Sequence, residues 1–295
     1  MFDQIFGNYL VEAGKITKDQ LADVIAYEST VRVKLGLIAV AEKLLTMEQA
    51  DEVNQLQAIM DKRFGDIAVE KGYLTSDQVE NLLKKQGNIY MIFVQTLIDK
   101  QIMTLEEIDK ALEEYQSKMG FAHSDMDALV SGDIDRTVKL FLPTEEELVE
   151  KHCAVAVRTF LRIIDSSAYV SKAYVTDSIK ADNLAMQTLQ GDHTITAAFV
   201  GRGDALLQTA GAFAKEEFDT VDMDALDSIG EFTNCINGLF AVEMGNEGTD
   251  LDMLPPEFFE SATEITGKKL CVMPIHSKEK EILFVIAFHE DIIVK

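Results

Sequence analysis

The stretch DSIGEFTNCINGLF, residues 227–240, has the apolar spacing of a helix but contains two asparagines and two glycines. On a helical wheel at about 100° per residue, one face carries the apolar residues Ala225, Ile229, Phe232, Ile236, Leu239 and Phe240. The opposite face carries Asp227, Glu231, Asn234 and Gly238, which lie within roughly 60° of one another on the same wheel. The pattern predicts a helix that packs on a core and presents the other four residues as an outward ridge.

The outward ridge contains residue types from which a solvent-exposed helix gains nothing, because asparagine and glycine form helices less readily than lysine or glutamate. A carboxylate and a carboxamide three residues apart, as Glu231 and Asn234 are, can do two jobs on a partner. The first can pair with a lysine, and the second can hold a water molecule in one orientation. The alternative is a solvated face whose end is marked by Asn237 and Gly238. The pattern gives no functional reason for Gly230 or Asn237, on the flank between the two faces.

The four ridge residues, with their spacing, resemble the signature of the CheC, CheX and FliY chemotaxis phosphatases. These proteins remove phosphate from the aspartate of phosphorylated response regulators such as CheY. The single copy of the signature and the proline-containing segment DLDMLPPEFF after it are similar to the CheX branch of the family. The likeness covers roughly residues 145–290.

The resemblance implies an enzyme, a hydrolase that acts on the aspartyl phosphate of a CheY-like receiver domain in chemotaxis or two-component signalling. It assigns Asn234 to the attacking water and Glu231 to the receiver's lysine, with Asp227 and Gly238 in supporting roles. It implies no cofactor on this chain, because the receiver supplies the aspartyl phosphate and the Mg²⁺. CheX relatives suggest a homodimer. The competing hypothesis is a non-catalytic adaptor that binds a receiver or senses cyclic di-GMP.

The residues around the signature predict an α+β domain over 145–295. A helix is expected in PTEEELVEKHCAVAVRTFLRII, and residues 167–178 and 194–201 are rich in strand-forming types. A further helix is expected with Asp204 as its N-cap, and KKLCVMPIHS with EILFVIAFHE predicts an antiparallel hairpin. We therefore expect an antiparallel sheet flanked by helices.

The first 115 residues contain a repeat of 29 residues in four copies. Threonines recur at this step and are Thr17, Thr46, Thr75 and Thr104. In the third copy, RFGDIAVEKGYLTSDQVENLLKKQ at 63–86, Gly72 predicts a helix C-cap. Thr75 and Gln78 predict a capping box at the start of a second helix. Each copy is therefore expected to be a helical pair, and such small pairs must stack to bury their apolar faces.

These copies resemble the repeats of the MshE-type N-terminal domain of type II secretion and pilus ATPases, some members of which bind cyclic di-GMP. Copies two and three fit best, and the resemblance assigns Lys34, Gly36, Arg63 and Gly65 to nucleotide binding. The cations would pair with phosphates, and the glycines would let a guanine approach the backbone. Copies one and four lack the basic residue, and copies two and four lack the internal glycine. The alternative is a scaffold for protein interaction, in secretion or elsewhere; no GxxxxGK[ST] motif occurs, so the chain is not the ATPase itself.

Residues 116–144 lack a sustained period and are interpreted as a linker between the repeats, 1–115, and the second domain. The chain has a net charge of −24 and both halves are acidic, which disfavours nucleic acid and anionic membrane surfaces as partners. No apolar run approaches the ~20 residues that span a bilayer, and no signal peptide is visible. Three scattered cysteines predict reduced thiols in a cytoplasmic protein, and five histidines without ligand spacing predict no metal site.

Overall fold

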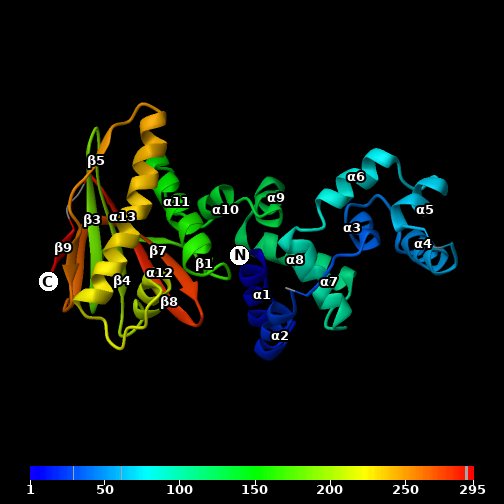
Figure 1. The fold of residues 1–295 in the computed structure, drawn as a ribbon, viewed down its shortest axis with the longest axis horizontal. Coiled ribbons are helices and arrows are strands. Elements are labelled where there is room, and N and C mark those ends of the chain that lie inside the picture. The colour runs from blue at the N-terminus through cyan, green and yellow to red at the C-terminus, as the bar shows by residue number, and fades with distance from the viewer. Residues whose placement is uncertain (29, 61, 290–291) are drawn as a thin grey trace. The chain divides into compact units, whose positions relative to one another are not determined.

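The computed structural model describes residues 1–295 except 29, 61, 290 and 291 (Figure 1). The chain divides into two compact units, Phe2–Gly132 and Asp133–Lys295, the second of which also includes Met1. The division falls inside 116–144, but this interval is not an irregular linker, because it holds α9 (His123–Ser131) and α10 (Ile134–Leu140). Both helices are too short to show a sustained apolar period in the sequence. Among the described residues, no helix combines the length and the apolar character needed to cross a membrane.

The first unit is built from helices, and its first eight form four consecutive pairs at the predicted 29-residue step. The pairs are α1 (Phe2–Glu12) with α2 (Lys18–Glu28), α3 (Leu35–Ala41) with α4 (Met47–Met60), α5 (Phe64–Glu70) with α6 (Ser76–Lys84), and α7 (Ile89–Asp99) with α8 (Leu105–Met119). Helix α9 follows them. The all-helical repeat region is therefore confirmed as secondary structure.

The same two backbone signals set the ends of the helices in every pair. Each repeat threonine forms a capping box: its hydroxyl accepts from the backbone N–H three residues on, and the Gln or Glu there accepts from the threonine N–H, at 2.8–3.3 Å. The first helix of each pair stops at a left-handed residue with φ between 56° and 71°; these residues are Gly14, Lys43, Gly72 and Gln101. Lys43 and Gln101 thus adopt the backbone conformation that glycine adopts most easily.

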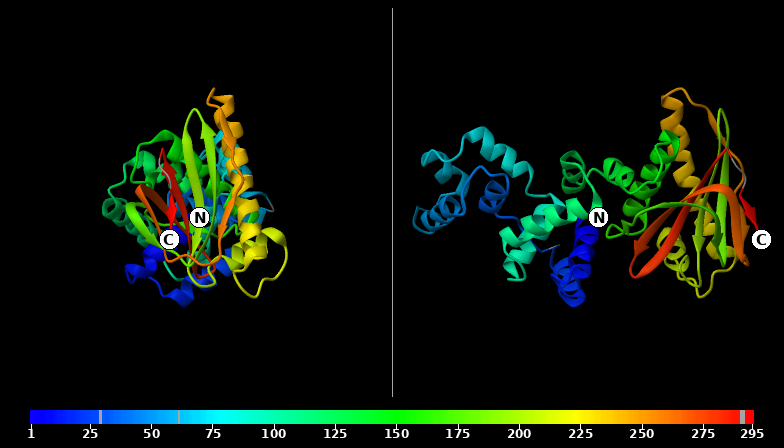
Figure 2. Two further views of the ribbon diagram at one scale, coloured as in Figure 1. Left: turned by 90° about the vertical axis from the view of Figure 1, so that its left-hand side faces the viewer. Right: turned by 180° about the vertical axis from the view of Figure 1, so that it is seen from behind.

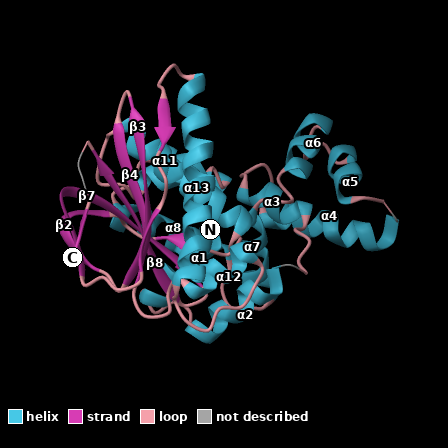
Figure 3. Ribbon diagram, turned by 60° about the vertical axis from the view of Figure 1, so that its left-hand side comes forward, coloured by secondary structure: helices cyan, strands magenta, loops and turns pink. Residues whose placement is uncertain are grey.

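The second unit is an antiparallel sheet with helices packed on it, which confirms the α+β class (Figures 1 and 3). The strand order is β1-β7-β8-β4-β3-β5, with β2 and β9 also paired to β7 and β6 paired to β3. The strands are β1 (Tyr169–Val170), β2 (Tyr174–Lys180), β3 (Asn183–Gly191), β4 (Thr194–Gly201), β5 (Leu251–Met253), β6 (Glu257–Phe259), β7 (Glu264–Ser277), β8 (Lys280–Phe288) and β9 (Ile293–Val294). The helices that follow α10 are α11 (Glu147–Ile163), α12 (Leu207–Ala214) and α13 (Met223–Asn246).

Sequence patterns located some of these elements and missed others. Strand β4 covers the predicted 194–201, and β7 and β8 form the predicted hairpin. Strand β3 was not predicted, and 167–178 is divided between β1 and β2. The expected cap at Asp204 is wrong: α12 begins after Leu206, and Asp204 instead accepts from Lys280 Nζ at 2.7 Å.

Each face of the sheet has its own apolar core. On one face, Phe199 of β4 lies between Phe160 of α11 and Phe232 of α13, with ring centroids 6.5 and 5.4 Å away. Helix α13 contacts β3 and β4, and α11 contacts β7 and β8, so the two helices lie side by side on this face. The opposite face buries a second cluster that includes Leu184, Val200 and residues near the C-terminus. The strands that carry it are strongly twisted (Figure 2).

We predict that Lys43→Gly and Gln101→Gly each stabilise the full chain by about 0.5–1 kcal/mol, because glycine relieves the strain of positive φ at these helix ends. Gly72→Ala should destabilise it by about 1 kcal/mol for the same reason. Urea-unfolding midpoints of the three variants and wild type provide the measurement. Destabilisation by the two glycine variants would show that the long side chains contribute more than the backbone strain removes.

Candidate functional site

Helix α13 carries the predicted ridge, and its N-terminus is set by Asp222, whose side chain accepts from the N–H of Ala225 at 3.1 Å. The helix continues to Asn246, so Gly238 lies in its interior and does not end it. Phe232, Ile236 and Phe240 are completely buried, as the apolar spacing predicts. Leu239, which the same spacing places in the core, is 41% exposed.

The buried face of α13 is rotated from the face that the apolar residues predict. It includes Gly230, Thr233 and Asn237, and it leaves Leu239 at the margin. The reason is that β3 and the segment after β5 offer partners for small and polar residues, which hydropathy alone does not reveal. Asn234 lies beside this buried face and is half-buried, so its description as part of a fully outward ridge is corrected.

Gly230 is explained by packing against the aromatic ring of Phe258. A Cβ atom at Gly230 would lie 2.2 Å from Phe258 Cε1, a distance that no real contact allows. Phe258 belongs to β6, which pairs with β3 through Ala185. The glycine therefore lets α13 lie close to this edge of the sheet.

Asn234 is attached to the sheet through a buried glutamine. Gln187 of β3, 1% exposed, donates from Nε2 to Asn234 Oδ1 at 2.8 Å and to the Leu254 carbonyl at 2.9 Å. Its Oε1 accepts from Asn237 Nδ2 at 2.8 Å. Asn237 Oδ1 lies 2.8 Å from Nε2 of His152 on α11. Neither Gln187 nor His152 could be identified from the sequence, because β3 was not expected and a lone histidine in a helix shows no ligand spacing.

His152 ends this network in an apolar environment. It is completely buried, and its ring stacks on Phe240 with centroids 4.2 Å apart. Burial lowers the pKa of His152 to about 4, against the opposing effect of the Asn237 hydrogen bond. The ring is therefore neutral at pH 7, and its Nδ1 is buried without a hydrogen-bond partner among the described residues.

The remaining ridge residues face solvent. Asp227 and Glu231 are exposed, and the described part of the chain offers neither of them an ion-pair partner. Gly238 is half-buried, and a Cβ there would make only an ordinary contact, 3.7 Å from Met253 Cε. Nothing inside the described structure therefore requires glycine at this position, in contrast to Gly230.

Apolar side chains border the ridge on the same surface. Leu239 and Val242 on α13 are 41% and 67% exposed, and Met253 and Leu254 after it are each 41% exposed. Together with Glu231, Asn234 and Gly238 they form what we call the α13 surface: a carboxylate and a carboxamide beside exposed apolar groups. Such a surface suits a protein partner better than a small molecule.

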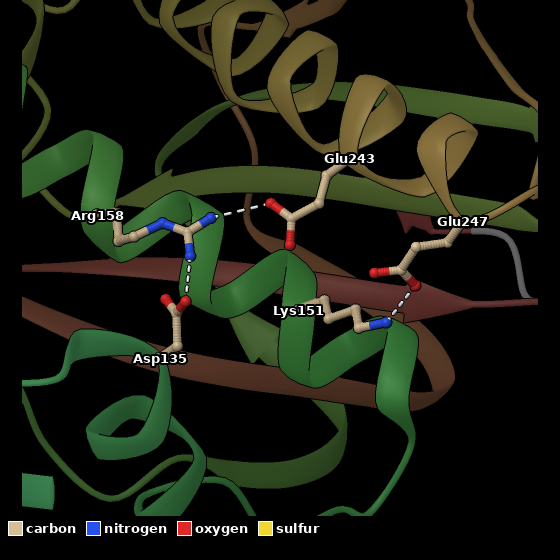
Figure 4. Close-up of polar contacts among 5 residues, drawn as sticks. All are labelled: Asp135, Lys151, Arg158, Glu243 and Glu247. Carbon is tan, nitrogen blue, oxygen red and sulfur yellow. Dashed lines mark hydrogen bonds and ion pairs between the residues drawn. The ribbon is translucent and has the colours of Figure 1, made fainter.

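Ion pairs hold the C-terminal half of α13 to α11 (Figure 4). Arg158 donates to Glu243 of α13 at 3.0 Å and also pairs with Asp135 of α10, so one guanidinium joins three helices. Lys151 pairs with Glu247 at 2.5 Å. These groups are partly exposed, so each pair contributes little stability.

The residues assigned to nucleotide binding line one cavity of the first unit. Its volume is about 590 Å³, and it is bordered by the starts of α3 and α5 and the ends of copies two and three, including Lys34, Gly36, Arg63, Gly65, Gln57 and Gln86. Arg32 also lines it, so three cations gather there in a chain of strong negative charge. Lys34 pairs with Asp99 at 3.1 Å, whereas no partner for Arg63 is found within the described ranges.

The two glycines of this cavity have a packing role of their own. A Cβ at Gly65 would lie 2.6 Å from Val79 Cγ1, and one at Gly36 would lie 2.9 Å from Phe64 Cε2. Close helix packing therefore requires glycine at both positions whether or not a ligand is present. Binding of a nucleotide by these residues stays a prediction.

Comparison with known proteins bears on the second unit. Residues 184–276 match the family model described as chemotaxis phosphatase CheX. This part of the chain is CheX-like. The match includes Gln187 and the whole of α13, with Glu231 and Asn234. The family match does not extend to the repeats, and none of the curated proteins matches the chain.

Solved structures with similarity to this chain include CheC-like and CheX proteins. A CheC-like superfamily protein from Shewanella sp. PV-4 shares 16% identity over 49% of this chain and 99% of its own, with a TM-score of 0.44. CheX from Vibrio vulnificus has 17% sequence identity to this chain; the alignment covers 48% of this chain and 99% of that protein, with a TM-score of 0.42. A chain of the CheX–CheY–BeF₃–Mg²⁺ complex from Borrelia burgdorferi has 16% sequence identity to this chain; the alignment covers 49% of this chain and 97% of that one, with a TM-score of 0.40.

We predict that Gly238→Ala stabilises the chain by about 0.5–1 kcal/mol, because alanine forms helices better than glycine and its Cβ meets no close neighbour. Gly245→Ala, also in α13 and with no atom within 4 Å of the new Cβ, should have the same sign. Gly230→Ala should destabilise the chain, because it collides with Phe258. Thermal unfolding of the three variants tests the set, and a destabilised Gly238→Ala would contradict the absence of an internal requirement for glycine.

Proposed function

We propose that the CheX-like domain accelerates hydrolysis of the aspartyl phosphate of a CheY-like receiver. The observation that carries the proposal is the pairing, on one helix, of an exposed Glu231 with an Asn234 carboxamide that is held against the sheet. The matching family model, described as a chemotaxis phosphatase, covers both residues. Gly238 supports it, since a helix-interior glycine without an internal packing role leaves room for a partner's backbone.

The chemistry requires little from this chain. The receiver brings the phosphorylated aspartate and its Mg²⁺, and water attacks phosphorus as the bond to the aspartate oxygen breaks. Asn234 would hold that water in line, and the departing carboxylate needs no proton at neutral pH. Such catalysis by positioning fits an amide that is fixed by hydrogen bonds before the partner arrives.

Glu231 would fix the register of the two proteins. It is exposed and has no competing cation among the described residues, so its carboxylate is available to a lysine of the receiver. The exposed Leu239, Val242, Met253 and Leu254 would bury apolar area around this ion pair. Desolvation by these neighbours would strengthen the pair relative to an isolated one in water.

The test is the dephosphorylation rate of a CheY-type receiver, loaded with a small phosphodonor that is then removed, with wild type and two variants. We expect wild type to accelerate the reaction, Asn234→Ala to lose about 10²-fold in maximal rate, and Glu231→Ala to lose receiver affinity. Gly238→Ala should bind the receiver more weakly although it folds more stably.

Gly245→Ala is the matched control, since it changes the same helix away from Glu231 and Asn234 and should keep the wild-type rate. If wild type binds several receivers and accelerates none of them, the domain is an adaptor and the phosphatase proposal fails.

We also propose that the cavity of the first unit binds cyclic di-GMP and so makes this unit a sensor. The supporting observation is that Lys34 and Arg63, from two successive copies, line one cavity together with Arg32. Its volume lies in the range of small-molecule sites, and guanidinium groups suit phosphate oxygens. Arg63 is not engaged elsewhere in the described structure, so it is available to an anion.

Calorimetric titration of the full chain with cyclic di-GMP should show micromolar affinity that falls at least tenfold in Arg63→Ala, since a charge-assisted phosphate contact is lost. Lys62→Ala is the neighbouring control: Lys62 pairs with Glu70 and does not line the cavity. No binding by wild type, or equal weakening by both substitutions, would favour the protein-interaction scaffold.

A further inference from the structure

The side chain of Gln187 is a buried amide whose donors and acceptor are all hydrogen-bonded. Its strand, β3, is otherwise apolar at its buried positions apart from Asn183, and Gln187 itself is 1% exposed. Both Nε2 hydrogens and Oε1 have partners, which are Asn234, the Leu254 carbonyl and Asn237. Burying an amide without such partners is unfavourable, so an apolar residue would fill the strand more simply. The network therefore suggests a role beyond packing.

One backbone atom fixes the orientation of the whole network. The Leu254 carbonyl can only accept a hydrogen bond, so the end of Gln187 that faces it must be the NH₂ group. The position of this carbonyl is itself fixed, because the Leu254 N–H donates to the Thr188 carbonyl at 2.9 Å. Asn234 meets the same NH₂ group and must therefore present Oδ1 to it.

The hydrogen bonds at the other end of the Gln187 amide fix the orientations of Asn237 and of His152 on α11. Its Oε1 requires a donor, so Asn237 presents Nδ2 to it and turns Oδ1 toward His152. His152 must then donate from Nε2, which leaves Nδ1 as the unprotonated nitrogen. An unpaired Nδ1 agrees with this assignment, since a buried acceptor without a partner is less unfavourable than a buried donor.

The consequence falls on Asn234, the last member. Because Asn234 Oδ1 accepts a hydrogen bond from Gln187, the amide cannot rotate by 180° without losing that bond. Nδ2 is then the end of the amide that has no bond within the described part of the domain. Nδ2 has no partner among the described residues and is not one of the buried unpaired atoms, so it reaches solvent. A free asparagine would sample both orientations of its amide.

We propose that Gln187 is a positioning residue that holds the Asn234 carboxamide with Nδ2 directed to the partner. This inference rests on the proposed phosphatase function for its kinetic consequence, but not for its structural one. An outward Nδ2–H would donate to the attacking water and leave the water's other lone pair free to meet phosphorus. Gln187 does not itself touch the receiver, because it is buried behind α13.

The first experiment is a double-mutant cycle on the receiver-dephosphorylation rate. Gln187→Leu should lower the maximal rate about tenfold, the ratio that corresponds to one lost hydrogen bond, and should leave the half-saturating receiver concentration unchanged. In the Asn234→Ala background the same substitution should have no further effect. An equal loss in both backgrounds would show that Gln187 acts through general stability, and the proposal would be wrong.

Gln187→Glu gives a second variant with a pH signature. Its carboxylate can still accept from Asn237, but it cannot donate to Asn234 or to the Leu254 carbonyl. Burial beside two oxygens raises the pKa of the new carboxyl above the ordinary value of about 4.3. As the pH falls through that pKa, the carboxyl gains a proton and can again donate to Asn234. The rate of the variant relative to wild type should therefore rise as the pH falls, and parallel pH profiles would contradict the proposal.

Hydrogen exchange of the Asn234 side-chain NH₂ group tests the positioning role of Gln187 without any measurement of phosphatase activity. In the full chain with ¹⁵N-labelled asparagine, the Asn234 NH₂ protons should exchange rapidly with water in wild type. In Gln187→Glu, at a pH at which the new carboxyl is ionised, the amide should turn its NH₂ group inward to the carboxylate, and exchange should slow at least tenfold relative to wild type at the same pH. Unfolding is followed in parallel by the backbone resonances of α13.

The outcomes are distinct. Slowed exchange together with no acceleration of any receiver by wild type would refute only the phosphatase proposal. Unchanged exchange of the Asn234 NH₂ protons in a folded Gln187→Glu with its new carboxyl ionised would overturn the positioning role, whatever the rates show.

Discussion

The close contact of α13 with β3 is the constraint on which the second unit depends. It requires a glycine at position 230, where the helix meets Phe258, and it turns Asn237 into the core. Once the helix lies this close, Gln187 of the strand can reach both asparagines of the helix. The geometry of the candidate site is therefore a consequence of how two elements pack, and not of a loop that carries reactive groups.

This packing places polar groups where apolar ones would be simpler. An apolar interface between α13 and β3 would bury more hydrocarbon, but it would leave Asn234 free to rotate. The hydrogen-bonded chain from His152 to Asn234 instead accepts one arrangement of donors and acceptors, because the Leu254 carbonyl determines its direction. Polar networks in which every link is paired give orientation as well as stability, and a side chain that must hold a water molecule benefits from orientation.

The first unit follows a different rule, in which local signals repeat. A threonine capping box and a left-handed residue bound the helices of all four copies, even where lysine or glutamine replaces the glycine. The spacing therefore survives changes in individual residues. The copies also differ at the starts of their first helices, where only copies two and three place cations beside one cavity.

Much of the secondary structure followed from the sequence, because it is encoded by neighbours in the chain. Capping boxes and the 29-residue step predicted the helical pairs, and a run rich in β-branched and apolar residues predicted β4. Two apolar runs joined by a charged turn predicted the β7–β8 hairpin, and the spacing of Glu231 and Asn234 placed a candidate pair on one helix. Strand β3 was missed because its polar residues Gln187 and Thr188 interrupt the apolar run. The exposed position of Leu239 was missed for a related reason, since hydropathy cannot show that a helix turns polar residues toward a strand.

What the sequence by itself determined was thus the four helical pairs of the first unit with their capping boxes, and the placement of Glu231 and Asn234 on one helix. Tertiary structure decided that the Asn234 side chain is hydrogen-bonded to Gln187, and that Asn237 and His152 are hydrogen-bonded to each other in the core. It also decided that packing requires glycine at position 230 but not at position 238. The physical reason is that each of these properties depends on an atom from a distant segment, such as the Leu254 carbonyl or the Phe258 ring. Periodicity along one helix contains no information about such atoms.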